Sequence, residues 1–260
     1  MNSYSRRRVG SSSKAIAATG SWTGMRNLPL AAIVSDRLTD GSGSETITDA
    51  RARSASRNRP IDGGTRGAQL RPPEELIVAT AEPVRLALRK LWSDHVIWTR
   101  EYIVAAVAGT PDASAAAGRL LKNQQDIGGA IVPYYGQGAG DALTGLLKAH
   151  ILIAVDLIEA AKANDQAAFA RHDARWSANI GEIAKLLAGA NPHWPEKDVL
   201  DLLALHLKLT TGEVVARLTK DWAADVKAFD DIFTEIMVVA DTLHDGLVAQ
   251  FPDRFAAKAG

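Results

Sequence analysis

The sequence contains no cysteine, few aromatic residues and no long apolar run. Without cysteine the chain has no disulfide, no thiolate metal site and no cysteine nucleophile. Aromatic residues make up 6% of the 260 residues and hydrophobic residues 47%. This alanine-rich composition favours closely packed helices over a β-sandwich. No apolar run approaches the roughly 20 residues of a membrane-spanning helix, so we expect a cytoplasmic protein with no membrane partner.

The formal net charge is zero, but the two signs are unevenly distributed along the chain. Residues 1–82 contain 12 Lys and Arg against 8 Asp and Glu, a balance of +4. Residues 83–260 contain 18 against 22, a balance of −4. The second part is therefore mildly acidic, which argues against nucleic acid as the partner of a folded domain there.

The first part of the chain is rich in Ser, Arg, Gly and Thr and shows no periodic apolar face over residues 1–70. Such a segment cannot bury enough apolar surface to offset the entropy that is lost on ordering. We therefore expect a disordered tail over residues 1–75 and a helical bundle domain over residues 76–260. Met25 is a second candidate start of translation, in which case residues 1–24 are not made.

Three segments of the bundle domain share one pattern. A leucine and an apolar residue are followed by two variable residues, a histidine, and apolar residues that lead to Thr or Ala. The histidines are His95, His150 and His206, which are 55 and 56 residues apart. Such regular spacing is typical of an internal repeat. We expect each histidine to begin a helix of about four turns, which a longer second helix follows.

Helix-breaking residues separate the two helices of each unit. The breaks at 109–112, 164–165 and 219–221 supply Pro, Asp or Thr, which suit the start of a new helix. The predicted second helices cover residues 112–132, 166–189 and 221–250. Because short loops between long helices give antiparallel neighbours, the sequence predicts an all-α bundle. It would have about six main helices, built from three helical-hairpin repeats of roughly 55 residues, and we favour a closed bundle over an open solenoid.

The three histidines lie on apolar helix faces, since positions three, four and seven residues apart share one side of a helix. His150, for example, shares its face with Leu147, Ala154 and Leu157. We therefore expect all three histidines to point inward. Packing of the repeats around a pseudo-symmetric axis would bring their imidazoles together.

The second helices of the first two units carry matching polar residues, an asparagine followed three positions later by an acid and an isoleucine. Imidazole is a common ligand for iron and zinc, and a ligating histidine needs an acceptor behind it. We therefore expect a site for a divalent transition metal, iron or zinc. Its candidate residues are His95, His150, His206, Asn123, Asp126, Asn179 and Glu182.

A structural alternative stays open beside metal or small-ligand binding. In it, each histidine is a core residue that hydrogen-bonds a helix backbone or a buried asparagine. The protein is then a structural or protein-interaction bundle, and a homo-oligomer is one form it could take. The sequence does not choose between the two hypotheses, and it assigns no reaction.

Several other kinds of site lack their motifs. A ferritin-like di-iron bundle needs two Glu-x-x-His pairs, whereas this chain has one comparable pair, Asp241 and His244. The six glycines of residues 128–145 lack the spacing and the adjoining Lys-Ser/Thr of a phosphate loop. We interpret them as an interhelical turn and expect no nucleotide cofactor. Nothing resembles the nucleophile elbow of a serine hydrolase.

Several short motifs carry a resemblance between Leu91 and Pro252. They are Leu91-Trp92, His95, Trp98-Thr99-Arg100, Pro133, Tyr135-Gly136, His150-Ile151, Asn191-Pro192, Trp194 and Gln250-Phe251-Pro252. This stretch resembles an uncharacterised bacterial family of small all-helical proteins. Its members sometimes carry the labels glycosyltransferase or acetylglutamate kinase, activities of α/β folds with nucleotide sites, and this chain has no parallel-sheet pattern. The resemblance therefore implies a helical fold and supplies no mechanism.

Overall fold

The computed structural model describes residues 74–256, so the tail predicted over residues 1–75 lies almost wholly outside the described residues. The described part consists of six long helices and one short one, without a strand. The all-α class and the six main helices are therefore confirmed. The helices are α3 (Glu74–Ala108), α4 (Ala113–Tyr135), α5 (Gln137–Lys162), α6 (Gln166–Ala190), α7 (Glu196–Thr219), α8 (Trp222–Gln250) and α9 (Pro252–Phe255).

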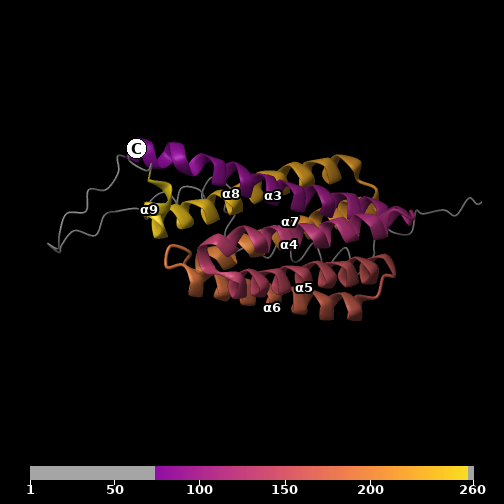
Figure 1. Ribbon diagram of the computed structural model, residues 1–260. Coiled ribbons are helices and arrows are strands. Elements are labelled where there is room, and N and C mark those ends of the chain that lie inside the picture. Colours follow the sequence, from indigo (N-terminus) through magenta and orange to yellow (C-terminus); the bar gives the residue numbers. More distant parts are fainter. Residues whose placement is uncertain (1–73, 257–260) are drawn as a thin grey trace, which may run out of the picture.

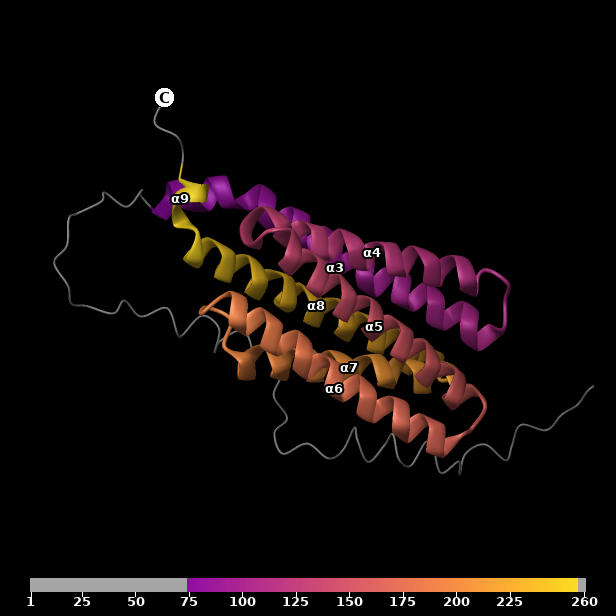
Figure 2. The same cartoon turned by 60° about the horizontal axis from the view of Figure 1, so that its bottom comes forward.

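The six long helices form a closed bundle (Figures 1 and 2). Each packs against the next along the chain, and α3 packs against α8, which closes the ring. In Figure 1, α3 and α8 run side by side along the upper edge. Helix α3 also contacts α5 and α7 across the interior. The closed bundle, and not the open solenoid, is thus the observed arrangement.

The turns within the predicted hairpins fall where the sequence placed them. Asp165 and Asp221 cap α6 and α8, because their carboxylates accept hydrogen bonds from the backbone N–H groups of Ala168 (2.9 Å) and Ala224 (3.0 Å). Gly109 follows α3 with a φ of 71°, a left-handed conformation that glycine adopts without steric cost. Local turn chemistry therefore fixes these boundaries.

The prediction that each histidine begins a helix is wrong. In the structure, the residues before each histidine belong to the same continuous helix as the histidine. His150 lies in the middle of α5, and His95 and His206 lie well inside α3 and α7. No proline precedes His150 within α5 or His206 within α7. The backbone hydrogen bonds of both helices therefore continue without a break up to the histidine. The histidines consequently lie midway along the bundle, away from its ends.

The glycine-rich stretch combines a turn with a close helix contact. Gly136, with a φ of 81°, is the only residue between α4 and α5. Gly128 and Gly140 face each other across these helices, where a Cβ on either would overlap the backbone of the other. The predicted interhelical turn is therefore found only at Gly136, because the other five glycines of the stretch lie within α4 or α5. Of these five, Gly128 and Gly140 let the two helices approach closely.

Apolar side chains from all six long helices fill the interior, but a polar layer interrupts them midway. The buried polar side chains of this layer are His95, Gln124, His150, Asn179, His206 and Glu235. None of the helices in residues 74–256 combines the length and the apolar content needed to cross a membrane.

Candidate functional site: a buried histidine cluster

The structure brings His95, His150 and His206 together from α3, α5 and α7. The Nε2 atoms of His95 and His206 are 3.4 Å apart, and the ring centroids of His150 and His206 are 6.5 Å apart. Each histidine is at most 5% exposed. The inward orientation expected from their helix faces is therefore what the structure shows. We call these three residues the histidine cluster.

Each imidazole is held at its Nδ1 atom by a polar side chain 29 residues further along the chain. These partners, at 3.2, 2.9 and 3.0 Å from Nδ1 of the respective histidine, are Gln124 of α4, Asn179 of α6 and Glu235 of α8. Every helix that carries a cluster histidine is thus followed by a helix that supplies its partner.

Of these partners, only Asn179 is among the candidate residues predicted from the sequence. Gln124 and Glu235 are not, because the residue type differs between the three units and only the 29-residue spacing recurs. Asn123, the residue predicted in place of Gln124, is buried next to the cluster and donates through Nδ2 to the carbonyl of Leu91 at 2.9 Å. Asn123 therefore ties α4 to α3 and does not bond to a histidine.

The two acidic candidates lie away from the histidine cluster. Asp126 forms an ion pair with Lys122 on α4, and Glu182 is exposed on α6. Each follows a buried asparagine by three residues, which places it about 60° around the helix from that asparagine. The structure therefore does not bring Asp126 and Glu182 to the imidazoles.

His150 differs from the other two histidines because both of its ring nitrogens have partners outside the cluster. The indole Nε1 of Trp176 donates to Nε2 of His150 at 3.1 Å. Nδ1 therefore carries the proton and donates it to Oδ1 of Asn179. Asn179 in turn donates through Nδ2 to the carbonyl of Leu146 at 3.1 Å. His150 is thus fixed as a neutral imidazole with no free nitrogen.

The other two histidines form a hydrogen-bonded chain that ends on a carboxylate. Nδ1 of His206 faces Glu235, so it carries the proton and donates it. Nε2 of His206 is then an acceptor for the Nε2–H group of His95. Nδ1 of His95 accepts from the amide of Gln124. One set of neutral imidazoles therefore satisfies all the ring nitrogens of the cluster.

Burial dominates the electrostatics of the cluster. It lowers the pKa of His95 well below the ordinary value, and His206 and His150 lower it further. Burial, followed by the influence of His206, lowers the pKa of His150 to about 3. Burial also raises the pKa of Glu235, against the opposing effect of His206. At neutral pH, His95 and His150 are therefore uncharged.

Two acceptors beside the cluster have no hydrogen-bond donor in the described part of the chain. They are Oε1 of Glu235 and Oε1 of Gln124. A buried acceptor without a donor costs about 1–3 kcal/mol, and more for a charged group. Both atoms belong to side chains that bond to a cluster histidine, so the layer has spare acceptors behind the imidazoles.

A small cavity of about 20 Å³ borders the cluster, which is enough for about one water molecule. Its lining includes the three histidines, together with Thr99, Tyr102 and Thr210. Within residues 74–256, no three His, Asp or Glu side chains are placed so that they could share a metal ion as they stand. The cluster therefore offers a histidine pair and a cavity, but not a complete set of protein ligands.

An ion-pair network occupies the neighbouring turns of α3, α7 and α8. Glu213 of α7, seven residues after His206, is paired with Arg100. Arg100 and Arg217 both bind Asp225, at 3.0 and 2.9 Å. Burial raises the pKa of Glu213 to about 7, although Arg100 opposes this. Glu213 therefore belongs to this network and makes no contact with the histidine cluster that the structure records.

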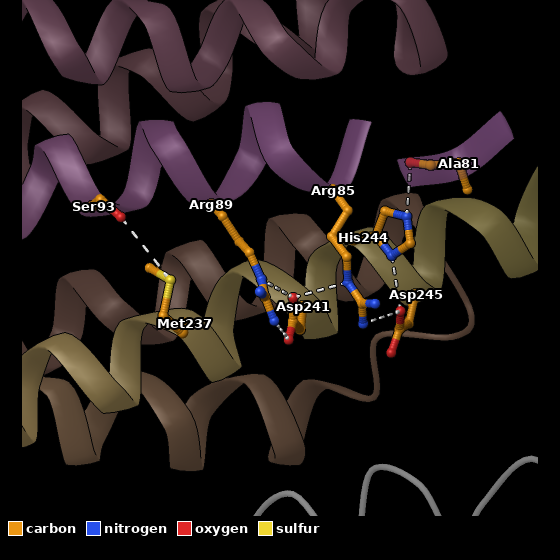
Figure 3. Close-up of polar contacts among 8 residues, drawn as sticks. All are labelled: Ala81, Arg85, Arg89, Ser93, Met237, Asp241, His244 and Asp245. Carbon is orange, nitrogen blue, oxygen red and sulfur yellow. Dashed lines mark hydrogen bonds and ion pairs between the residues drawn. The ribbon is translucent and has the colours of Figure 1, made fainter. Parts of the chain in front are cut away.

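The single pair that resembled a di-iron motif has other partners, as Figure 3 shows. Asp241 of α8 receives hydrogen bonds from Arg89 at 2.7 Å and from Arg85 at 3.2 Å. Nε2 of His244 lies 3.3 Å from the carbonyl of Ala81. This region therefore joins α3 to α8 through ion pairs and a hydrogen bond.

Comparison of the chain with protein-family models, curated proteins and solved structures finds no match. The geometry of the histidine cluster is therefore the observation that bears on function.

Proposed function

We propose that the histidine cluster binds one divalent transition metal, iron or zinc, with the Nε2 atoms of His95 and His206 as its first two ligands. The observation that carries this proposal is their 3.4 Å separation. Two nitrogen ligands at bond lengths of about 2.05 Å around a tetrahedral metal lie about 3.3 Å apart. The pair therefore has the spacing of two ligands before any side chain moves.

The Nδ1 partners support this role. A carboxylate behind a ligating imidazole, as Glu235 lies behind His206, orients the ring and raises its basicity. Metal binding at Nε2 of His95 would require the other tautomer of this imidazole, in which the proton lies on Nδ1 and not on Nε2. Oε1 of Gln124, which is otherwise unpaired, could then accept a hydrogen bond from Nδ1–H once the amide turns over. Both imidazoles then have an acceptor behind them.

The remaining coordination positions have two sources. His150 is the third cluster nitrogen, but its Nε2 atom must first release the indole of Trp176. Water in the adjoining cavity is the other source. A metal with protein ligands at only some positions keeps open sites for exchange. We therefore propose a binding site and assign no reaction to it.

We also propose that the bundle consists of three helical-hairpin repeats of roughly 55 residues. The 29-residue spacing between histidine and partner, in all three units, supports this. So do Thr99 and Thr210, which donate to the carbonyl of the cluster histidine four residues earlier. A cytoplasmic location, a homo-oligomer and membership of the bacterial helical family stay predictions from the sequence.

The test is a zinc titration of the full, untagged and metal-stripped chain by isothermal titration calorimetry. We expect the wild type to bind one zinc ion per chain. His95→Gln and His206→Gln keep polar side chains but lose a ligand, so each should abolish measurable binding. Glu235→Gln, which weakens the support of His206, should reduce the affinity by about 10- to 100-fold.

The matched control is His193→Gln, because His193 is exposed and lies outside the cluster. It should bind zinc as the wild type does. If the wild type binds no zinc, or if His206→Gln binds it with unchanged affinity, the proposal is wrong. Circular dichroism of each variant separates loss of the ligand from loss of the fold.

A second candidate function is a purely structural polar core. The observation that favours it is the complete set of partners at the ring nitrogens, above all the bond from Trp176 that closes His150. Under this hypothesis the same variants lose stability, and neither they nor the wild type bind zinc. The titration therefore separates the two candidates.

A further inference from the structure

A stripe of apolar side chains runs along the outer side of the first half of α8. Trp222 and Val226 are 53% and 55% exposed, and Phe229 and Phe233 are partly exposed. The four residues are spaced four, three and four positions apart, so they share one face of the helix. Single exposed apolar residues are ordinary, whereas a contiguous group of them is typical of an interaction surface.

Helix α3 adds Ile97 to this stripe. Oγ of Ser93 lies 4.0 Å from Sδ of Met237 on α8 (Figure 3), and the guanidinium of Arg100 lies 4.9 Å from the ring centre of Phe229. Ile97 falls between Ser93 and Arg100 at helical spacing, so it lies on the same side of α3, and it is 39% exposed. We call the following five residues the apolar patch: Ile97, Trp222, Val226, Phe229 and Phe233.

Two arginines hold aromatic rings of the apolar patch in place. Arg100 lies over the ring of Phe229, and Arg217 lies over the ring of Trp222 at 5.0 Å. The buried carboxylate of Asp225 anchors both guanidinium groups. The rings are therefore ordered before any partner arrives, which lowers the entropy that binding costs.

The uncompensated charge at the border of the apolar patch is negative. The two arginines just described pair with acids, and so does Lys227. Glu101 lies four residues after Ile97, and Asp230 lies four residues after Val226. Both acids are exposed, and neither forms an ion pair with another residue of 74–256. A partner with an apolar centre and basic ends therefore suits this surface.

The chain itself contains a segment of this character. Residues 1–73 contain 12 Lys and Arg against 5 Asp and Glu, a balance of +7, whereas residues 74–256 contain 17 against 25, a balance of −8. The longest apolar stretch before residue 74 is residues 28–34, Leu-Pro-Leu-Ala-Ala-Ile-Val. Arg26 and Arg37 lie on either side of it.

We propose that residues 26–37 of the chain dock on the apolar patch of the same molecule. The apolar side chains of residues 28–34 cover Trp222 and Val226, and the flanking arginines lie beside Glu101 and Asp230. The surface thus serves as the docking site of the chain's own basic segment. It lies outside the histidine cluster and does not depend on the proposed metal site.

The length of chain between the segment and the bundle favours an intramolecular contact. Residues 38–73, which are 36 in number, lead from the segment to Glu74, where α3 begins. A Gly/Ser-rich linker of that length spans about 33 Å on average. Ile97 lies about 35 Å along α3 from Glu74 at the rise of an α-helix. A linker that matches its span gives the highest effective concentration, so the chain's own segment outcompetes that of a second copy.

The first experiment places a nitroxide spin label next to the segment in the full chain. Because the chain has no cysteine, Thr39→Cys provides a single labelling site two residues after Arg37. We expect the NMR signals of the Val226 methyl groups and the Trp222 indole to lose more than half of their intensity. The methyl signals of Leu152, which is 53% exposed on α5, should keep theirs. Equal losses at Val226 and Leu152, or no loss at Val226, would overturn the proposal.

A mixed sample separates the chain's own segment from that of a second copy. It combines a spin-labelled chain without isotopes and an isotope-labelled chain without the nitroxide, so only contacts between copies reduce the signals. We expect Val226 to keep its full intensity in this mixture. A loss as large as in the first experiment would show that a second copy occupies the apolar patch, against the proposal.

Substitutions on both sides of the contact supply matched variants. Val226→Asp puts a charge at an exposed position of the patch, and Ile33→Asp does so in the segment. Either should restore the Trp222 indole signal of the spin-labelled chain, whereas Leu152→Asp should not. If the signal stays broadened in Val226→Asp with unchanged circular dichroism, the segment does not dock here.

The contribution of charge is tested with salt and with neutral variants. In about 1 M salt, where the Debye length falls to about 3 Å, the loss of signal at Val226 should become several-fold smaller. The double variant Glu101→Gln, Asp230→Asn should reduce it in the same direction at low salt. Indifference to both changes would overturn the charge complementarity on which the choice of this segment rests. His206→Gln should leave all these results unchanged, because the histidine cluster is not part of the patch.

Discussion

His206 and His150 have similar surroundings in the bundle, but their Nε2 atoms meet different partners. Both are buried on inner helix faces, and both are held at Nδ1 by a side chain 29 residues later. Nε2 of His206 faces the same atom of His95, whereas Nε2 of His150 accepts from Trp176. Equivalent positions in the fold therefore do not give these two histidines the same capacity to bind a ligand. That capacity depends on the side chain that faces Nε2.

The largest expected loss of stability follows from removing the hydrogen bond between His206 and the carboxylate of Glu235. His206→Leu removes the partner of Glu235, which is 1% exposed. A buried acceptor that loses its donor costs about 1–3 kcal/mol, and more when it is charged, so we expect a loss of about 3 kcal/mol in the free energy of unfolding, measured by urea denaturation. The double variant His206→Leu, Glu235→Leu should recover part of it. A double variant as unstable as the single one would contradict the pairing.

The second prediction concerns pH at His150. Its pKa is lowered to about 3 in the folded chain, chiefly by burial, and is about 6.5 when unfolded. Below pH 6.5 the unfolded chain binds a proton that the folded chain does not. The wild type should therefore lose up to about 1.4 kcal/mol per pH unit relative to His150→Gln as the pH falls from 6.5 to 4.5. A stability difference that is independent of pH would refute this.

Glu213 should show the opposite sign over a similar range. Burial raises its pKa to about 7 in the folded chain, against about 4.3 unfolded. Its stabilising contribution is complete below the unfolded pKa and is lost as the pH rises toward 7. Compared with Glu213→Gln, the wild type should therefore become less stable between pH 4.5 and 7 in the same urea experiments. A change in the other direction would show that Arg100 outweighs burial.

Much of this arrangement follows from local sequence rules, and the remainder depends on tertiary contacts. Apolar spacing placed the histidines on inward faces, and Asp165 and Asp221 marked helix starts. The role of Trp176 could not be predicted, because its bond to His150 depends on how α5 and α6 are rotated against each other. Glu235 was missed for a similar reason, since three different residue types fill the same structural position.

A smaller effect should follow from Trp176→Phe, which keeps a ring but removes the donor to His150. An acceptor left without its donor in the core costs about 1–3 kcal/mol. Trp222→Phe on the exposed start of α8 is the matched control, and should change stability by less than about 0.5 kcal/mol. In zinc titrations, Trp176→Phe should raise the affinity, because Nε2 of His150 is then free to bind.

The smallest expected change in stability concerns the hydroxyl group of Thr210, which α7 has and α5 lacks at the corresponding position. Thr210 donates to the carbonyl of His206 at 2.9 Å, and α5 has Ala154 at the corresponding position after His150. Thr210→Ala should therefore cost no more than about 1 kcal/mol, measured by thermal unfolding. A larger loss would mean that the hydroxyl also organises the adjoining cavity.

The most direct measurement of the central claim is elemental analysis of the full chain, isolated without a histidine tag, beside His206→Gln prepared in the same way. We expect about one iron or zinc atom per wild-type chain and a small fraction of that in the variant. Equal metal content in the two proteins, whether high or low, would contradict a site built on the facing Nε2 atoms of His95 and His206.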